Sequence, residues 1–355
     1  MITVAAVYVY FLIFAQFGFL KAVQAARGAE GDVIRPIMAV MGLMGVTGSV
    51  LAACFFSENK CRHWLAAGFG FCAVAAVGSL GAKSPTGFYL VAGLTGLGVG
   101  LATVTLAGML RRSVGDESLG KIIGLGTGLA YGICNLPGIF DASPETQAQL
   151  ALAAVAAGWA GGRRLAPRFQ LEQPGGGEYS PKGTAAWVVV FVALVCLDSA
   201  AFYVIQHATD LKEGMWTGTG RLMLNAGVHL GVAVLTGWAL DRRWMGRTVG
   251  LGAVLLLLAC WLINERHQAL GWAGLFYVAG VSIYSTALVF YPARSGRPWL
   301  AALVYAVAGW GGSALGIGLA ENRSELPGAV ITLAAAIIAL SLGGRHLMRR
   351  PEPPA

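Results

Sequence analysis

Asp198 stands in the middle of an apolar segment and is the residue of this 355-residue chain best placed to do chemistry. It lies about two-thirds of the way along the stretch 185–206, about 12 Å from its C-terminal end at about 1.5 Å per residue. The next stretch carries Arg221, Asn225 and His229 four residues apart, on one face of a helix. By the same rise Asn225 and His229 are about 10 to 17 Å deep, level with Asp198.

A carboxylate, an amide and an imidazole at one depth could form a proton-coupling or solute-binding cluster, because the charge of a buried acid responds to burial and to neighbouring cations. Ionisable groups inside membrane segments are usually functional. We therefore interpret Asp198 as the carrier of a coupled proton, with Arg221 and His229 tuning its protonation. The alternative is a permanent pair of Asp198 with Arg221 or His229, which locks the two segments together at a cost in desolvation.

Several other side chains in apolar stretches are candidates to line a solute site. Tyr277, Tyr284 and Tyr291 recur every seven residues on one helical face. We interpret Tyr277 and Tyr291 as membrane-interface residues, which leaves Tyr284 as the deep member. Further lining candidates come from two other stretches: Trp310, Ser313 and Gln16. The Gln16 amide has an alternative role in hydrogen bonding between helices.

Three methionines are the only candidates for a metal site that we name. Met38, Met41 and Met44 repeat every three residues, and soft thioethers suit Cu(I). A spacing of three rotates by about 60° per step, however, and methionine also fills helix and lipid contacts without any ligand role. We predict no cofactor.

The elements that must position these residues are twelve apolar stretches, each about 17 to 25 residues long and able to cross roughly 30 Å of hydrocarbon. With 56% hydrophobic and 12% charged residues, the chain has too little polar surface for a water-soluble globule. We therefore expect an all-α polytopic membrane protein. The twelve stretches are 2–22, 36–56, 64–82, 86–110, 119–140, 146–162, 185–206, 217–240, 246–263, 268–291, 298–320 and 326–344.

The positive charges predict the topology. If both termini are cytoplasmic, 17 of the 25 Lys and Arg residues fall in cytoplasmic loops and 8 on the other side. Cytoplasmic loops of membrane proteins are enriched in these residues, so we expect both ends inside and the protein in the cytoplasmic (inner) membrane of the cell. Anionic lipid headgroups account for the net charge of +8, and we expect no nucleic acid partner. The N-terminus is interpreted as the first span and not as a removed signal.

One long connection divides the chain into two sets of six spans. Residues 164–184 are rich in Gly and Pro, which suits a flexible linker. We expect a six-helix bundle at 1–163, a second at 185–346 and a cytoplasmic tail at 347–355. The third, sixth, ninth and twelfth spans hold no deep ionisable residue and should be peripheral, whereas the other eight should line the interior.

Six plus six spans, termini inside, a basic central linker and peripheral third helices resemble the major facilitator superfamily (MFS). The loop after the eighth span resembles a motif of that superfamily at these positions: Gly237, Asp241, Arg242, Gly246 and Arg247. The loop after the second span departs from it, with Ser57 to Arg62 in place of the Asp-Arg core. The resemblance implies that the motif residues act at a cytoplasmic gate and that two pseudo-repeats alternate around a midplane site.

We therefore expect a secondary transporter of a small molecule or ion, driven by an ion gradient, such as that of protons, or by the solute's own gradient, and not an enzyme. Two alternatives stay open. One is a non-transporting scaffold or assembly subunit of a larger membrane complex, which should have a closed apolar centre with Asp198 paired. The other is a copper importer for respiratory oxidase assembly, since some superfamily members resemble such importers.

Overall fold

The computed structural model contains helices joined by turns and loops, and no strand, in the residues that it describes, which are 1–28, 31–166, 168–169, 179–265, 270–321, 323 and 325–348. Part of the predicted linker 164–184 and most of the predicted tail 347–355 lie outside these residues. The first half of the chain forms α1 (Ile2–Val9), η1 (Tyr10–Gly18), α2 (Phe19–Arg27), α3 (Gly31–Cys54), α4 (Cys61–Gly81), α5 (Pro85–Val114), α6 (Leu119–Cys134), α7 (Pro137–Phe140) and α8 (Pro144–Arg163).

The second half continues with α9 (Pro181–His207), α10 (Thr209–Trp216), α11 (Thr219–Asp241), α12 (Met245–Glu265), α13 (Leu270–Ser295), α14 (Pro298–Leu303), η3 (Val304–Gly311), α15 (Gly312–Ala320) and α16 (Gly328–Met348). A helix lies at each of the twelve predicted stretches. In the described part of the chain nine helical segments are long and apolar enough to cross a membrane, and α6 and part of α16 are shorter apolar helices. The chain is a multi-pass membrane protein, and the number of twelve crossings stays a prediction.

Three of the long helices begin with the same Ser-Pro pair. The side chains of Ser84, Ser143 and Ser180 each accept a hydrogen bond from a backbone N–H three residues ahead, at 3.1, 3.3 and 3.1 Å. The proline that follows each serine occupies the first helical position, where its fixed φ suits the helix and its missing N–H costs nothing. These pairs set the starts of α5, α8 and α9.

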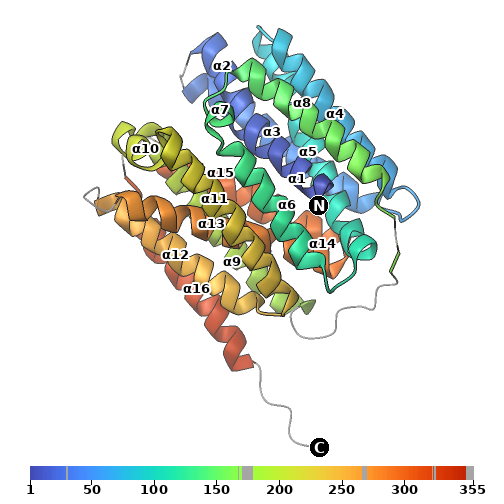
Figure 1. Ribbon diagram of the computed structural model, residues 1–355, viewed down its shortest axis with the longest axis vertical. Coiled ribbons are helices and arrows are strands. Elements are labelled where there is room, and N and C mark those ends of the chain that lie inside the picture. The colour runs from blue at the N-terminus through green and yellow to red at the C-terminus, as the bar shows by residue number, and fades with distance from the viewer. Residues whose placement is uncertain are drawn as a thin grey trace, which may run out of the picture.

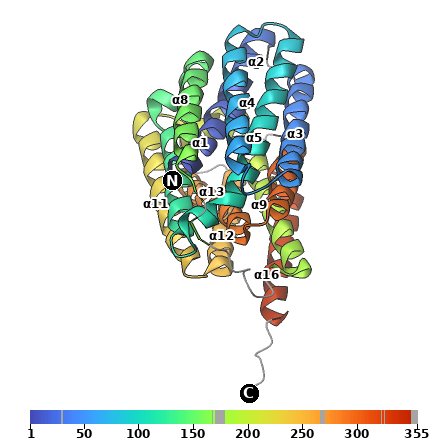
Figure 2. The same ribbon diagram turned by 90° about the vertical axis from the view of Figure 1, so that its right-hand side faces the viewer.

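The molecule has two parts in Figure 1: one is formed by helices α1–α8, and the other by α9–α13 together with α16. The axes of these helices run obliquely from upper left to lower right in that view. Two ends of the bundle can thus be distinguished. We call the end that carries Met1 and the last turns of α16 the terminus side, and the end that carries α2, α7 and α10 the α10 side. Helix α16 lies at the edge of the molecule in both views (Figures 1 and 2).

Four segments form the buried centre. Between 67% and 78% of the residues in the most apolar windows of α1–α2, α5, α9 and α13 are buried, against 39% in α3 and α11 and in α4 and α12. The latter helices expose large apolar side chains to the surroundings, such as Val74 and Val254. The helix that carries Asp198 and the helix that carries its tyrosines are therefore both central.

Glycines allow the closest helix crossings. A Cβ at Gly96 would lie 2.8 Å from the backbone nitrogen of Gly45, and one at Gly100 would lie 2.8 Å from that of Ser49. The crossing of α3 and α5 therefore depends on residues without side chains, as is common between membrane helices.

Candidate functional site

The carboxylate of Asp198 is held by two tyrosines of α13. The Tyr277 hydroxyl donates a hydrogen bond of 2.5 Å to Oδ1, and the Tyr284 hydroxyl donates one to Oδ2. Both tyrosines are 4% exposed, while Asp198 is only partly buried. Tyr277 and Tyr284 are seven residues apart, two helical turns, so both hydroxyls reach the same carboxylate from one face of α13. Hydrogen bonds to an ionised acceptor are stronger than neutral ones, so the two tyrosines offset part of the cost of burying the Asp198 carboxylate.

The alternative in which Asp198 pairs permanently with Arg221 or His229 is wrong. The Arg221 Nη2 group donates to the carbonyl oxygen of Gly214 at 3.1 Å, on the α10 side. The His229 Nδ1 atom lies 2.7 Å from the Ser282 hydroxyl. Among the described residues Asp198 forms no salt bridge. Sequence depth placed these groups at one level, but helix rotation and packing decide which side chains meet.

His229 and Asn225 instead connect α11 to its neighbours. The imidazole of His229 stacks on the Tyr131 ring of α6, with centroids 4.6 Å apart and planes 16° apart. The Asn225 amide donates to the carbonyl of Met215 at 3.0 Å, and its Oδ1 atom is buried without a donor in the described part of the chain. His229 thus bridges the two halves of the chain beside the site.

The interpretation of Tyr277 and Tyr291 as membrane-interface residues is also wrong. Tyr277 binds Asp198, and Tyr291 is 1% exposed and stacks on Tyr179 with centroids 5.2 Å apart. The repeat of seven residues marks a wholly interior face of α13. The signal was present in the sequence, but a tyrosine near the end of a span fits an interface position equally well.

The remaining lining candidates lie on α1–η1 and on α14–η3–α15. Trp310 packs edge-on against the Phe11 ring at 6.1 Å, across the two halves. Ser313 accepts a hydrogen bond of 3.0 Å from Ser199 of α9, one residue after Asp198. Gln16 is partly buried on η1. Both η1 and η3 are π-helical, a rare conformation that is frequent at functional sites.

Five aromatic rings meet on the α10 side of Asp198 and form what we call the aromatic cluster: Phe17, Phe140, Phe202, Trp216 and Tyr277. The Phe17 ring of the first half lies 5.5 Å from Phe202 of the second. The Trp216 ring lies 5.4 Å from Phe202 and 5.7 Å from Tyr277, whose hydroxyl binds Asp198. The cluster therefore closes the space between the halves on this side. Sequence reasoning missed it because its rings come from five separate segments.

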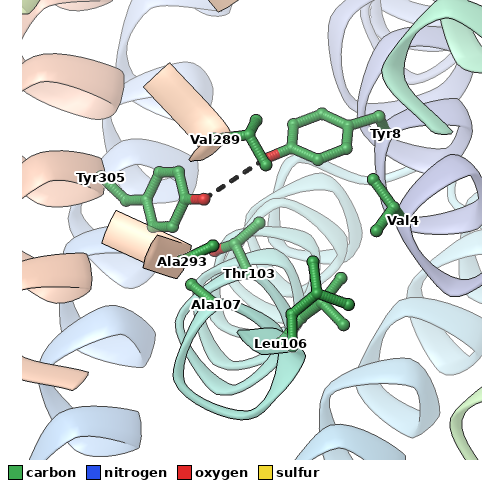
Figure 3. A pocket seen from close by; sticks show the side chains of 9 residues that line it. Val4, Tyr8, Thr103, Leu106, Ala107, Val289, Ala293 and Tyr305 are labelled. Atoms are coloured by element: carbon green, nitrogen blue, oxygen red, sulfur yellow. Dashed lines mark hydrogen bonds between the residues drawn. The ribbon is translucent and has the colours of Figure 1, made fainter. Parts of the chain in front are cut away.

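On the terminus side the halves meet through tyrosine, threonine and apolar residues. The Tyr8 and Tyr305 hydroxyls lie 3.5 Å apart at a small pocket, which Figure 3 shows from close by. Thr103 and the apolar side chains of α1, α5 and α13 line the rest of it. Thr127 of α6 and Thr286 of α13 share a hydrogen bond of 3.0 Å. Asp198 therefore lies between two sets of contacts that join the halves.

The motif after α11 binds the start of α6. The Asp241 carboxylate accepts hydrogen bonds from the backbone N–H groups of Gly120 at 2.6 Å and Lys121 at 3.0 Å. These donors belong to the first turn of α6, where a negative charge is favourable. Gly237 makes the approach possible, since a Cβ there would lie 2.8 Å from the carbonyl carbon of Gly120.

The arginines of this motif lie at the surface. The Arg242 guanidinium lies 3.4 Å from the centroid of the Trp238 ring. Gly246 and Arg247 are exposed at the start of α12. The loop between α3 and α4, which departs from this motif, makes a different contact: an ion pair between Glu58 and Arg112.

A second ion pair lies on the terminus side, at the end of α5. The Arg111 guanidinium hydrogen-bonds both carboxylate oxygens of Asp116, with 2.6 Å between Nη2 and Oδ2. That hydrogen bonding, followed by the charge of Arg111, holds the pKa of Asp116 below its ordinary value. Arg111 is only 4% exposed, and its pairing with Asp116 neutralises the charge that is buried there.

The three methionines lie on α3. Met41 is 2% exposed, and Met38 packs against the same apolar core. A Cβ added at Gly93 of α5 would lie 3.7 Å from Met44 Cγ, so this residue faces α5. The described residues hold no group of three His, Cys, Asp or Glu side chains arranged for a metal ion.

A wider hollow of about 760 Å³ lies apart from Asp198, between α4 and α8. Its lining includes Arg62, Arg163 and Trp159, and the Arg163 guanidinium lies 5.1 Å from the centre of the Trp159 ring. This hollow is not lined by Asp198 or by its tyrosines, so we do not assign it to the candidate site.

No protein-family model and no curated protein sequence matches the chain. Solved structures do match it over nearly its whole length. The human organic anion transporter MFSD10 (TETRAN) shares 12% identity at a TM-score of 0.66, over 96% of this chain and 97% of that one. A bacterial homologue of the iron transporter ferroportin, in an outward-facing state with soaked iron, shares 14% identity at a TM-score of 0.66, over 98% of both chains.

The proton:xylose symporter XylE, described as an MFS protein, shares 12% identity at a TM-score of 0.64, over 98% of this chain and 94% of that one. The chain has the major facilitator fold. The resemblance inferred from the sequence is confirmed at the level of the fold, and the three structures named here are described as transporters or as the homologue of one. Asp198 and the tyrosines that bind it belong to the second half of the chain, and Phe202, four residues further along α9, contacts Phe17 of the first half. At such low identity the comparison does not extend to the cargo.

Proposed function

We propose that the chain is a secondary transporter that moves a small solute or ion across the cytoplasmic (inner) membrane by alternating access. In this proposal twelve helices cross the bilayer, and the halves 1–163 and 185–346 rock about the site between them, joined by the linker 164–184. Both ends, with the tail 347–355, are cytoplasmic, so the terminus side faces the cytoplasm. The distribution of Lys and Arg and the major facilitator fold support this arrangement.

The observation that carries the proposal is the placement of Asp198 between two closures. The aromatic cluster joins the halves on the α10 side, and the contacts at Tyr8, Thr127 and Asp241 join them on the terminus side. A transporter needs contacts on each side that break in turn while the other set holds. An ionisable group enclosed between such sets is placed to meet each side of the membrane alternately.

Roles follow from the contacts. Asp198 carries the coupled proton, and Tyr277 and Tyr284 hold its carboxylate in place. Asp241 closes the cytoplasmic gate through the first turn of α6, where Gly237 permits the close approach. Arg242, Gly246 and Arg247 belong to the same gating loop and lie at its surface. Other residues around Asp198 line the solute site or position its walls: Gln16, Arg221, Asn225, His229, Trp310 and Ser313.

The structural neighbours are described as an organic anion transporter, a homologue of an iron transporter and a proton:xylose symporter, so the fold leaves the cargo open. Proton coupling in this chain rests on Asp198 and not on the symporter among the neighbours. The sequence holds no nucleotide-binding motif, which supports an ion gradient or the solute's own gradient as the driving force.

The test is solute-driven proton movement in proteoliposomes. Purified protein is reconstituted with a pH-sensitive dye inside, and sugars, amino acids, organic anions and organic cations are added outside in turn. The native chain should change the internal pH with at least one class of solute, and Asp198→Asn should abolish that change. Asp210→Asn removes an exposed carboxylate of α10 and should behave like the native chain.

A scaffold subunit of a membrane complex is the second candidate, and one observation favours it. Both oxygens of Asp198 already accept hydrogen bonds, and the halves touch on both sides of it. A scaffold would keep this closed arrangement permanently. A scaffold would move neither protons nor solute with any of the four solute classes. Asp198→Asn would then only lower the unfolding temperature, because there would be no transport to lose.

A further inference from the structure

We propose that the solute is a small organic cation, an amine or ammonium group on an aromatic or aliphatic body, whose charge binds at Asp198 and whose body packs on the aromatic cluster. This inference rests on the proposed transport function and names its substrate class. It starts from the balance of charge around the carboxylate.

Asp198 is the one carboxylate deep in the described helices, and no cation neutralises it there. Arg111 is paired with Asp116 on the terminus side, and Arg221 donates to a backbone carbonyl on the α10 side. The Lys21 ammonium donates to the carbonyl of Phe140 at 3.1 Å. An ionised carboxylate inside the helix bundle without a counter-charge is costly, so Asp198 favours a cation as its ligand.

The aromatic cluster supplies the second half of the argument. Tyr277 binds Asp198 with its hydroxyl and contacts Trp216 with its ring, at 5.7 Å and an interplanar angle of 72°. Phe202 continues the row at 5.4 Å from Trp216. Ring faces attract ammonium groups and also exclude water, which strengthens the attraction to the carboxylate. A carboxylate at the inner end of a row of rings is the combination that recognises an organic cation.

Other classes of solute fit the described residues less well. An anion would meet Asp198 with no unengaged Lys or Arg beside it. A polyhydroxylated solute needs several hydrogen-bonding side chains beside Asp198, but the amide nitrogens of Asn225 and Asn135 donate to backbone carbonyls and the Ser282 hydroxyl is bound to His229. A divalent metal ion needs several ligands, and the described residues hold no His, Cys, Asp or Glu cluster of that kind.

An unfilled acceptor on the same side adds to the case for an amine. The Oδ1 atom of Asn225 is buried and receives no hydrogen bond in the described part of the chain. Its amide nitrogen donates to the carbonyl of Met215, which directly precedes Trp216 of the aromatic cluster. A bound N–H donor would satisfy an acceptor that is otherwise costly to leave unpaired.

The experiment compares four probes that share a benzyl or phenyl ring and differ in charge: benzylamine, benzyltrimethylammonium, benzyl alcohol and benzoate. Binding to the full-length protein in detergent is measured by calorimetry, and counterflow of the same probes is measured in proteoliposomes. We expect both cations to bind and to exchange, and neither benzyl alcohol nor benzoate to compete with them. Asp198→Asn should weaken cation binding by at least about tenfold, as expected for loss of a charge-assisted contact, while Asp210→Asn leaves it unchanged.

A second variant keeps the inference testable if Asp198→Asn fails to fold. Trp216→Leu removes a ring but no charge, and should weaken benzyltrimethylammonium binding several-fold, in the range expected for a cation–π contact. Uptake of benzoate or benzyl alcohol without the cations would overturn this inference and leave the proposed function standing. No uptake of any solute class would overturn both, and cation binding unchanged in Asp198→Asn would overturn the assignment of the charge to this residue.

Discussion

Gly124→Ala should open the terminus side of the protein. Gly124 of α6 faces α11 at the point where the two halves touch, and a Cβ there would lie 3.0 Å from the Gly237 Cα atom and 3.1 Å from its nitrogen. Both neighbours are backbone atoms, which cannot rotate away. Overpacking of this kind costs typically about 1–3 kcal/mol, and the cost applies only while α6 and α11 are in contact.

The proposed mechanism converts this cost into a shift of population. If the terminus side opens during transport, the strain is relieved in the open state, and about 1–3 kcal/mol raises the open-to-closed ratio by about 5- to 150-fold. The change in helix propensity from Gly to Ala is about 1 kcal/mol and acts equally in both states, because α6 is helical in each. It therefore stabilises the chain without shifting this equilibrium.

The assay is the labelling rate of one cysteine by a membrane-impermeant thiol reagent. The cysteine replaces Thr103, which lines the terminus-side pocket and is 9% exposed, in a chain whose six native cysteines have been replaced. Gly132→Ala is the matched control on the same helix, since its Cβ would meet nothing nearer than 3.5 Å. The labelling rate should rise at least about fivefold with Gly124→Ala and stay unchanged with Gly132→Ala. Equal rates in the two variants would refute the reasoning.

Three further predictions concern other contacts. Phe202→Ala removes two ring contacts of the aromatic cluster, worth about 0.5–1.5 kcal/mol each beyond burial, so amide hydrogens of α10 should exchange faster; unchanged exchange would contradict the role of the cluster. Gly100→Ala should lower the unfolding temperature, because its Cβ would lie 2.8 Å from the α3 backbone, whereas Gly93→Ala should not. The lowered pKa of Asp116 means that its pair with Arg111 stabilises the fold above about pH 4 and is lost as the pH falls through the lower folded value. Asp116→Asn should thus destabilise by at most about 1 kcal/mol at neutral pH and flatten the acid dependence of unfolding, and an equally steep acid transition in the variant would exclude this role.

Much of the fold was predictable because the bilayer limits what the chain can do. Apolar segments must be helical, and each of the twelve predicted stretches coincides with a helix of the structure. The short helices α7 and α10 and the π-helical turns of η1 and η3 were not predicted. Their sequences have no periodicity that separates them from a loop or an ordinary helix, and tertiary contacts such as Phe11 on Trp310 accompany them.

The candidate site was predictable in its centre and not in its contacts. Asp198 drew attention because an acid deep in a span is rare, and the spacing of Tyr277 and Tyr284 placed both on one face of α13. What the sequence could not provide is which helices are neighbours and how each is rotated. Arg221 and His229 are at suitable depth but turn to Gly214 and Ser282, so a depth argument paired the wrong residues.

The central claim is that the two halves open in turn on either side of Asp198. Spin labels at exposed positions measure this directly, with Glu117 and Trp299 as the terminus-side pair and Lys83 and Lys212 as the α10-side pair. Electron–electron distance distributions would be recorded in lipid nanodiscs between pH 5 and pH 9, with and without benzyltrimethylammonium. The account predicts reciprocal changes, one pair lengthening as the other shortens. Distances that stay fixed in both pairs under every condition, or that lengthen together, would contradict it.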